Sequence, residues 1–188
     1  MSTQPRQQLN ARQAETVERL LAAADEDLRE SGPEGVTVRS VAGRAGVSPA
    51  TAYTYFASRN HLFAELFWRA VLVAHPAEIA DGDPLARVQS VTRQLAAILA
   101  AAPHLAAAAN HALLGTDPDV ERVRVVIGSE LVSRFRAALG QASTQELLDA
   151  LSVTLTGTLL QTGMGLISYD ELPARLDSLM ATVMKGNA

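Results

Sequence analysis

The residues from 37 to 56, TVRSVAGRAGVSPATAYTYF, form two short helical patterns separated by a tight joint at 46–48. Thr37 is a hydroxyl N-cap for the first pattern, whose apolar residues recur at helical spacing for about two turns and stop at Gly46. Ser48 and Pro49 restart the chain, because a serine N-cap followed by proline favours a helix start. The segment therefore predicts a helix-turn-helix, the geometry that places a second helix in the major groove of DNA.

The second of these helices has one face suited to packing and one suited to contact with DNA bases. Ala52 and Phe56 share a face at i, i+4 spacing, so we expect that face to be buried. The opposite face and its flanks carry small or polar residues: Ala50, Thr51, Tyr53 and Thr54. Small uncharged side chains let the backbone approach base edges closely, and a threonine offers a hydroxyl and a methyl group to a base.

The charge around this segment differs from that of the whole chain, which carries a formal net charge of −4. No Asp or Glu occurs between Gly35 and Ala64, whereas Arg39, Arg44 and Arg59 all fall there. A local positive patch on an acidic protein favours phosphate contact at one place. An acid-free stretch of this length also arises by chance, and the combination with the turn chemistry is what favours DNA binding.

The stretch from about Arg19 to Phe67 resembles the tetracycline-repressor (TetR) family of bacterial transcriptional regulators. RLLAAADEDLRESG resembles the first helix of the family with its closing glycine, VTVRSVAGRAGVSPATAYTYF the helix-turn-helix, and ASRNHLFAELF the opening of the fourth helix. Ala50 replaces a common glycine, and Asp25 and Asp27 stand where the family usually has apolar residues. An apolar stripe still runs along this helix, so both aspartates can face outward.

The resemblance implies roles for individual residues of the predicted DNA-binding site. The residues that match phosphate anchors of the family are Thr37, Tyr53, Tyr55 and Arg59. The residues expected nearest the base edges are Ala50 and Thr51, together with Arg39 and Arg44. Ser48, Pro49 and Thr54 complete the predicted site. Tyr53 has an alternative interpretation, because an aromatic residue on a short helix often packs into the core.

The chain is long enough for two domains. We predict a flexible N-terminal arm at 1–10, a helix-turn-helix DNA-binding domain at 11–67, and a helical effector-binding and dimerisation domain at 68–188. The later helices are expected at 58–75, 84–102, 104–114 and 118–139, then from a capping box at 143–146, and finally at about 172–185. The predicted fold is all-α with about nine helices. The absence of cysteine excludes thiolate metal sites, and the polar N-terminus predicts a cytoplasmic location.

No residue from Ala150 to Tyr169 is charged. A membrane span is one interpretation of such a run, but its hydroxyl residues and three glycines make it too polar for lipid. We favour a homodimer interface, because a helix that is uncharged all round must be covered on both sides. Burial within one chain is the alternative. The resemblance also implies dimerisation through the last two helices, and the predicted interface comprises Leu151, Thr154, Gly157, Thr158, Gln161, Leu176 and Met180.

A two-fold dimer places two recognition helices in successive major grooves, about 34 to 36 Å apart, on a pseudo-palindromic operator. The resemblance implies a repressor that a small molecule releases by binding among the later helices. The candidate effector contacts are bulky or polar residues in helices rich in Ala, Leu and Val: Trp68, His75, Asn110, His111, Phe135, Leu160 and Met164. The alanine-rich stretch at 96–109 leaves room for a cavity and a mainly apolar effector, although tight helix packing explains it equally well.

An enzyme is the first competing class of function. The sequence contains no nucleophile elbow and no glycine-rich phosphate loop, and between His104 and His111 there is no Cys or acidic residue to complete a metal site. The sequence therefore predicts no catalytic residue, metal or cofactor. A second alternative is a structural DNA-bound factor of the same fold that needs no effector, which a solidly filled helical core would favour.

Overall fold

The computed structural model describes residues 11–186, which form nine α-helices, a π-helical turn and a 3-10 turn, with no strand among them. The helices are α1 (Ala11–Gly35), α2 (Val38–Arg44), α3 (Pro49–Tyr55), α4 (Arg59–Phe67), α5 (Pro84–Ala101), α6 (Pro103–Leu114), α7 (Pro118–Leu139), α8 (Gln145–Gly163) and α9 (Leu172–Lys185). The π-helical turn η1 (Trp68–Val73) continues α4, and the 3-10 turn η2 (Gly140–Ala142) follows α7. The all-α prediction is confirmed; the predicted arm at 1–10 lies outside the described residues.

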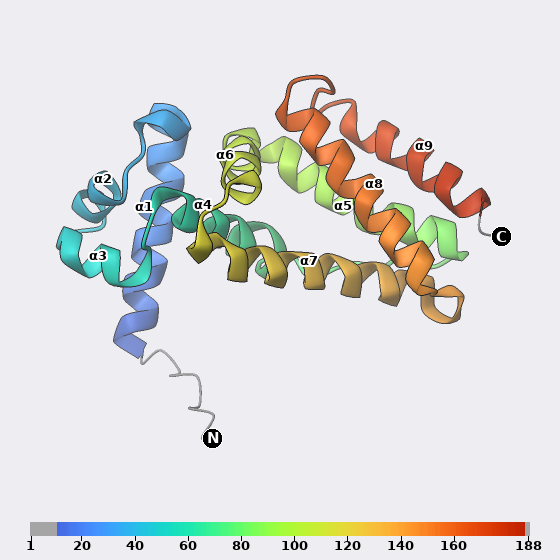
Figure 1. The fold of residues 1–188 in the computed structure, drawn as a ribbon, viewed down its shortest axis with the longest axis horizontal. Helices are drawn as coiled ribbons and strands as arrows, with labels where there is room; N and C mark the ends of the chain where they lie inside the picture. The colour runs from blue at the N-terminus through green and yellow to red at the C-terminus, as the bar shows by residue number, and fades with distance from the viewer. Residues whose placement is uncertain (1–10, 187–188) are drawn as a thin grey trace.

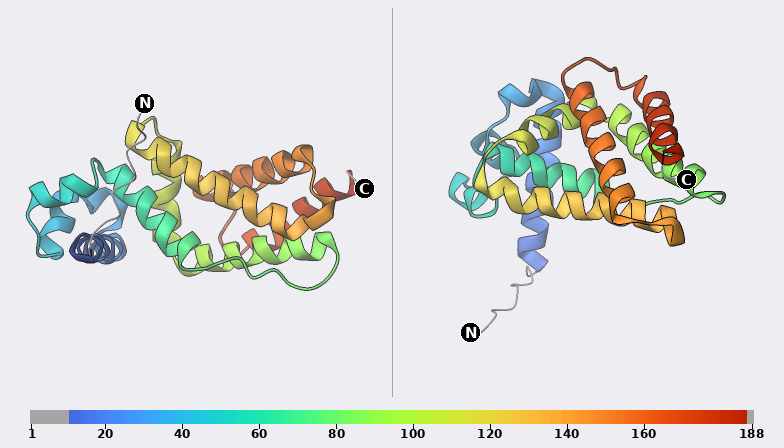
Figure 2. Two further views of the ribbon diagram at one scale, coloured as in Figure 1. Left: turned by 90° about the horizontal axis from the view of Figure 1, so that it is seen from below. Right: turned by 45° about the vertical axis from the view of Figure 1, so that its right-hand side comes forward.

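The helices form two groups joined by α4 (Figure 1). Helices α1 to α3 make up one end of the molecule, and α5 to α9 form the larger bundle at the other end (Figures 1 and 2). Helix α4 packs against α1 on one side and against α6 and α7 on the other. Helix α4 therefore links the larger bundle to α3, which comes directly before it in the chain.

The joint between α2 and α3 is a Schellman turn. Gly46 has φ +66°, the N–H of Gly46 donates to the carbonyl of Gly43 at 3.2 Å, and the N–H of Val47 donates to the carbonyl of Ala42 at 3.0 Å. This conformation is left-handed, so glycine fits it without strain. On the far side, the hydroxyl of Ser48 accepts from the N–H of Thr51 and caps α3. The predicted helix-turn-helix and its caps are confirmed.

Helix α1 departs from the prediction that its aspartates face outward. The helix is interrupted at Gly32, which has φ +67°. Asp27 is buried, with 7% of its surface exposed, and its Oδ1 accepts from Nε of Arg44 at 2.5 Å. Asp25 accepts from Nε2 of His104 at 3.2 Å, which joins α1 to α6. The outward assignment was wrong because the two carboxylates find partners on other helices, a contact that helical spacing alone does not predict.

The end of the fourth helical segment is also more irregular than its sequence suggests. The structure replaces the single predicted helix at 58–75 by α4 followed by η1, whose hydrogen bonds follow the wider π spacing. Arg134 of α7 is buried, and its Nη2 donates to the carbonyl of Leu72 at 2.7 Å and to that of His75 at 3.0 Å. These bonds satisfy carbonyl groups at the end of the π turn, where regular helical partners are absent.

The later helices begin and end close to the predicted residues. Asp83 caps α5 and Asp117 caps α7, each followed by proline at the first helical position. The cap of α8 is Thr144 rather than Ser143, and its hydroxyl accepts from the N–H of Leu147 at 3.2 Å. Helix α9 spans the predicted range. The predicted boundaries hold because caps act over only a few residues.

The uncharged run at 150–169 is accommodated by α8 and the turn that follows it. The hydroxyl groups of Thr154, Thr158 and Thr162 each donate to the carbonyl four residues earlier, at 2.7 to 3.0 Å. These bonds satisfy polar side chains within the helix itself. Among residues 11–186 no single helix is long and apolar enough to span a membrane, although α5 and α6 together meet that length and composition with a bend of 107° between them.

Candidate functional site

Helix α3 presents its predicted reading face to solvent. Pro49, Ala50 and Thr54 are exposed, Tyr53 is 52% exposed, and Ala52 on the opposite face is fully buried. Phe56 is buried, as predicted for a packing residue. Tyr53 is therefore not a core residue in the described structure, which removes the alternative interpretation.

Several hydroxyl groups on this face are already engaged within the protein. The Thr37 hydroxyl accepts from the N–H of Ser40 at 2.9 Å as part of a capping box. The Ser48 and Thr51 hydroxyls lie 2.8 Å apart, and the Thr54 hydroxyl donates to the carbonyl of Ala50 at 3.0 Å. Each oxygen can still accept from a base amino group, whereas a phosphate needs a donor, and the Thr54 O–H is already donated to Ala50. Tyr55 differs from the others because it is half-buried and packs against the core.

Acidic side chains of α1 lie close in space to this segment, although no acidic residue occurs within it. Arg44 binds three carboxylates of α1, those of Glu26, Asp27 and Glu30. The hydrogen bond and the charge of Arg44 hold the pKa of Glu30 below its ordinary value. These contacts direct the guanidinium of Arg44 toward α1, so its predicted position near base edges is not what the structure shows.

The other two arginines of the segment have fewer acidic partners among the described residues than Arg44 has. Arg39 is exposed on α2. Arg59 donates from Nη1 to the carbonyl of Pro33 at 3.1 Å and lies 3.5 Å from the carboxylate of Glu34, which is 85% exposed. An exposed ion pair of this kind contributes little stability, so a phosphate can compete for the same guanidinium. The positive patch of the described surface is therefore narrower than the sequence predicted.

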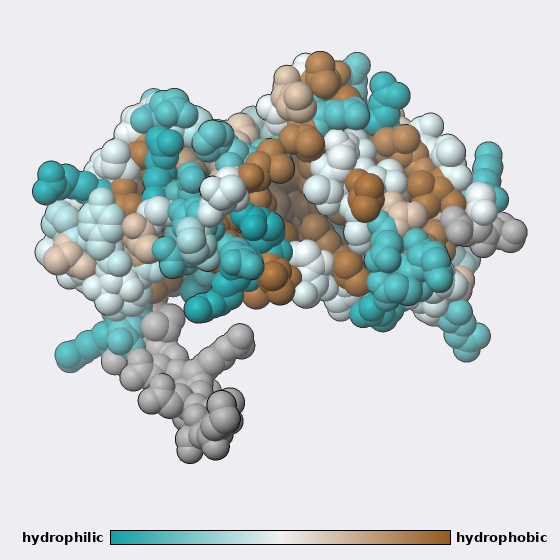
Figure 3. Space-filling view, in the orientation of Figure 1, coloured by the Kyte–Doolittle hydropathy of each residue, from teal (hydrophilic) through white to brown (hydrophobic). Residues whose placement is uncertain are grey.

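A second site is a cavity of about 260 Å³ in the helical bundle. In the space-filling view a hollow bordered by apolar surface opens between α6, α7 and α8 (Figure 3). Its walls come from α4 to α8 and the turn after α8: Phe67, Leu99, Ala106, Ala109, Asn110, Leu113, Leu114, Arg124, Ile127, Gly128, Leu131, Thr156, Leu159, Leu160 and Tyr169. Most of this lining is aliphatic or aromatic, which suits a mainly apolar ligand.

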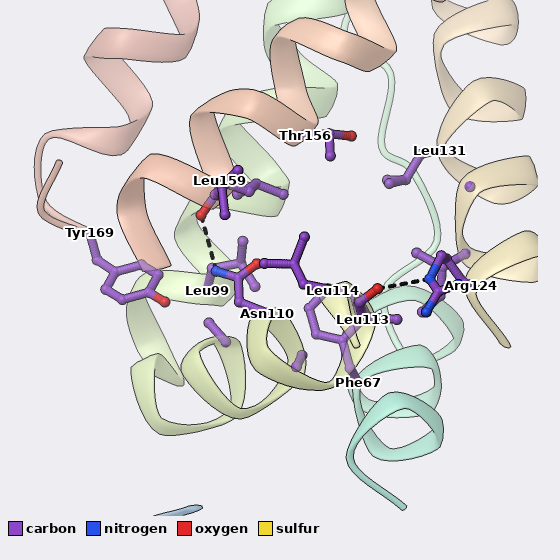
Figure 4. A pocket seen from close by; sticks show the side chains of 15 residues that line it. Phe67, Leu99, Asn110, Leu113, Leu114, Arg124, Leu131, Thr156, Leu159 and Tyr169 are labelled. Atoms are coloured by element: carbon purple, nitrogen blue, oxygen red, sulfur yellow. Dashed lines mark hydrogen bonds between the residues drawn. The ribbon is translucent and has the colours of Figure 1, made fainter. Parts of the chain in front are cut away.

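The polar groups of the cavity lie at separate positions around it (Figure 4). Asn110 donates from Nδ2 to the carbonyl of Leu159 at 3.0 Å, which ties α6 to α8. Gly163 permits this contact, because a Cβ there would lie 2.3 Å from Nδ2 of Asn110. The hydroxyl of Tyr169 is buried without a hydrogen-bond partner among the described residues, and burial raises the pKa of that phenol. It therefore remains protonated at neutral pH, able to donate to a ligand.

The cavity contains only two of the seven predicted effector contacts, Asn110 and Leu160. Phe135 packs in the core, while His75, His111 and Met164 are exposed and Trp68 is half-buried outside the lining. Bulk and polarity were the wrong criterion, because they do not tell which face of a helix lines a space. Arg124 was missed although a signal existed: it falls four residues after Val120 and seven before Leu131, on the apolar stripe of α7.

The corner between α6 and α7 connects the cavity to the start of α4. Arg124 donates from Nε to the carbonyl of Leu113 at 2.8 Å and from Nη2 to that of Gly115 at 2.6 Å. Two residues later, Asp117 caps α7 and accepts a hydrogen bond from the hydroxyl of Ser58, the cap of α4. That hydrogen bond holds the pKa of Asp117 below its ordinary value, so the carboxylate is ionised at neutral pH.

A third feature is the outer face of α8 and α9. Val153 is 72% exposed and Leu166 70%, and both border a groove that also contains Gly157, Gln161 and Arg175. Four of the predicted dimer contacts instead point into the protomer: Leu151, Thr158, Leu176 and Met180. Leu176 and Met180 lie on the buried face of α9, which packs against α5 and α8. Thr154, Gly157 and Gln161 remain accessible.

Comparison with known proteins gives these features a family. Residues 20–66 match the model described as bacterial regulatory proteins, tetR family. An uncharacterised HTH-type transcriptional regulator of Mycobacterium tuberculosis is 40% identical over 179 residues, which cover 94% of this chain and 84% of that protein, and its counterpart in Mycobacterium bovis matches equally well. This chain belongs to the TetR family. It is a DNA-binding transcriptional regulator.

Solved structures of transcriptional regulators share the whole fold. A TetR regulator from Rhodococcus sp. RHA1 superimposes with a TM-score of 0.77 at 23% identity, covering 92% of this chain and 96% of that one. The regulator FadR of Bacillus subtilis, solved in complex with stearoyl-CoA, has a TM-score of 0.68 at 18% identity and covers 90% of this chain and 98% of its own. At these identities the likeness establishes the TetR fold, from α1 to α9.

Proposed function

We propose that this TetR-family regulator is a repressor that binds a pseudo-palindromic operator as a homodimer and is released by a small, mainly apolar effector. The observation that carries the proposal is the cavity, because one of its walls is Phe67 of α4. Helix α4 follows the recognition helix α3 directly. A ligand that binds the cavity more tightly in one position of α4 than in another shifts the spacing of the two recognition helices.

The dimer proposal rests on exposed apolar side chains beside a groove between α8 and α9. Val153 and Leu166 are large, exposed apolar residues at this groove, within the uncharged run at 150–169, and Arg175 is the one charged residue of its lining. Exposed apolar surface of this kind marks interaction sites, and Gly157 allows a second helix to approach closely. A two-fold contact here places the same surface of each protomer against its copy. The proposed interface is therefore the outer face of α8 and α9, with Thr154, Gly157 and Gln161 retained from the sequence prediction.

The DNA contacts are proposed from the exposed face of α3 and its neighbours. We retain Thr37, Arg39, Ser48, Pro49, Ala50, Thr51, Tyr53, Thr54 and Arg59, with Tyr55 as a partly packed support. The division of the chain after residue 67 remains a prediction, since α4 packs against both groups of helices. Bacterial operator DNA lies in the cytoplasm, where we expect the protein to act.

The cavity also weighs against a DNA-bound structural factor that needs no effector. A solidly packed bundle would have favoured that alternative, whereas about 260 Å³ of space lined by apolar side chains favours a ligand. FadR of Bacillus subtilis shares this fold and was solved in complex with stearoyl-CoA, which is consistent with an apolar effector.

The two arginines of α2 give a matched test of which one contacts DNA. Arg44→Ala leaves the buried carboxylate of Asp27 without its partner, so we expect the melting temperature to fall by a few degrees. Arg39→Ala removes an exposed side chain, so we expect unchanged stability but weaker operator binding and a shallower dependence on salt. Thermal unfolding and fluorescence anisotropy over a salt series separate the two effects. A stability loss in Arg39→Ala, with none in Arg44→Ala, would reverse both assignments.

Effector control is tested by filling the cavity. Gly128 lines it, and a Cβ at this position meets no atom within 4 Å, so Gly128→Leu extends over the cavity without a clash at its base. We expect the variant to bind operator like the wild type and to lose release by the effector. Gly128→Ala is the control, because it also removes a glycine from a helix interior, adding up to about 1 kcal/mol of stability, but leaves the cavity open.

The operator for these measurements is obtained by selecting bound fragments from genomic DNA, and the neighbouring genes then indicate compounds to screen. Release of wild-type protein and of Gly128→Ala, but not of Gly128→Leu, is the expected result. Equal release of all three places the effector elsewhere, and no release by any compound supports the structural factor instead.

A further inference from the structure

We infer that the cavity binds an amphiphile with an apolar chain and an anionic head group, in the simplest case a carboxylate, and that Arg124 holds this head group. The inference rests on the proposed effector control and adds the chemistry of the ligand and the residue that recognises it.

Arg124 is the one charged side chain in a lining that is otherwise apolar or neutral. Its Nε and Nη2 atoms donate to the carbonyl groups of Leu113 and Gly115, and these bonds use one edge of the guanidinium. In the described part of the chain, Nη1 has no hydrogen-bond partner and no carboxylate forms an ion pair with Arg124. A positive charge beside low-dielectric surface and without a counter-ion attracts an anion, and a guanidinium matches a carboxylate in geometry.

The space is large enough for the apolar part of such a ligand. At about 260 Å³ it exceeds the roughly 150 Å³ of an apolar cavity that binds benzene, so a head group with a chain of about eight carbon atoms is a suitable test compound. Figure 4 shows Arg124 and Tyr169 on opposite sides of the cavity, so a chain that starts at Arg124 runs past Phe67 and the leucines toward the tyrosine.

The position of Arg124 also explains how such a head group acts on DNA binding. The same guanidinium fastens the corner between α6 and α7 through Leu113 and Gly115. From this corner Asp117 reaches the cap of α4, Ser58. A carboxylate that binds Nη1 pulls on the same guanidinium that holds the two carbonyl groups, so binding of the head group changes the strength of this link. Ligand binding and the position of α4 are thereby coupled through one side chain.

Three probes of equal chain length and different head group test the inference: octanoate, 1-octanol and octylamine. Their binding to the full chain is measured by isothermal titration calorimetry. We expect octanoate to bind at least about tenfold more tightly than 1-octanol, and octylamine to bind most weakly, because a charged hydrogen bond is gained only with the anion. Octanoate is also expected to weaken operator binding.

Two glutamine variants identify the residue responsible. Arg124→Gln should bind octanoate and 1-octanol equally, whereas Arg122→Gln, an exposed arginine on the same helix, should keep the wild-type preference. Equal binding of octanoate and 1-octanol by the wild type overturns the inference even if Arg124→Gln does not fold, and leaves effector control intact. A preference that persists in a folded Arg124→Gln overturns it as well. Failure of all three probes to bind the wild type overturns the apolar cavity as the effector site together with the inference.

Discussion

Val153→Asp should give a folded monomer that binds the operator at least about 100-fold more weakly than the wild type. Val153 is 72% exposed in the protomer, so an aspartate there costs little in folding. In the proposed dimer the same residue is covered by the second copy, where an unpaired carboxylate loses its hydration at a cost of several kcal/mol. A monomer then engages one half-site alone and loses the contribution of the second recognition helix.

Light scattering coupled to size-exclusion chromatography measures the mass of the variant, and fluorescence anisotropy its operator affinity. Val125→Asp is the matched control, because Val125 is also an exposed valine, 63% accessible, but lies on α7 rather than on α8 or α9. The control should remain a dimer with wild-type affinity. A dimer of unchanged stability in Val153→Asp would place the subunit contact on another face.

Tyr53→Ala should lower operator affinity by about 100-fold while leaving the protein as stable as the wild type. Tyr53 is half-exposed on α3, and the described residues give its hydroxyl no hydrogen bond, so its removal leaves the core intact. A lost phosphate contact reduces affinity about tenfold, and the two-fold complex loses it twice. The change in the free energy of unfolding should stay within about 0.5 kcal/mol.

Anisotropy with the selected operator and chemical denaturation measure the two quantities on the same preparation. Tyr53→Phe separates the hydroxyl from the ring, and Tyr55→Ala is a useful contrast because Tyr55 packs against the core and should lose stability. Arg59→Ala should weaken operator binding in the same way. Wild-type affinity in both Tyr53→Ala and Arg59→Ala would remove the phosphate-anchor assignment.

Much of the fold was predictable because its boundaries depend on local chemistry. Asp117 followed by proline starts α7, and Gly46 stops α2 through bonds that span at most five residues. The π-helical turn η1 was not predictable in this way. It depends on Arg134, which reaches carbonyl groups about sixty residues earlier in the chain.

The candidate sites were predictable to different degrees. The exposed face of α3 follows from helical periodicity, since burial of Ala52 fixes which residues face solvent. The cavity and the proposed subunit face did not follow, because α8 carries apolar or small residues on several sides. For such a helix the packing angle of the neighbours decides that Leu151 is inside and Val153 outside.

The sequence by itself determined that this protein carries a helix-turn-helix in an all-α chain, with the residues that start and stop its helices. These features depend on contacts between residues a few positions apart, which a linear pattern contains. Only the tertiary structure decided that Arg44 faces the acids of α1 and that Arg124 and Tyr169 border one cavity. Such contacts join distant parts of the chain, and periodicity defines the face of a helix without defining what packs against it.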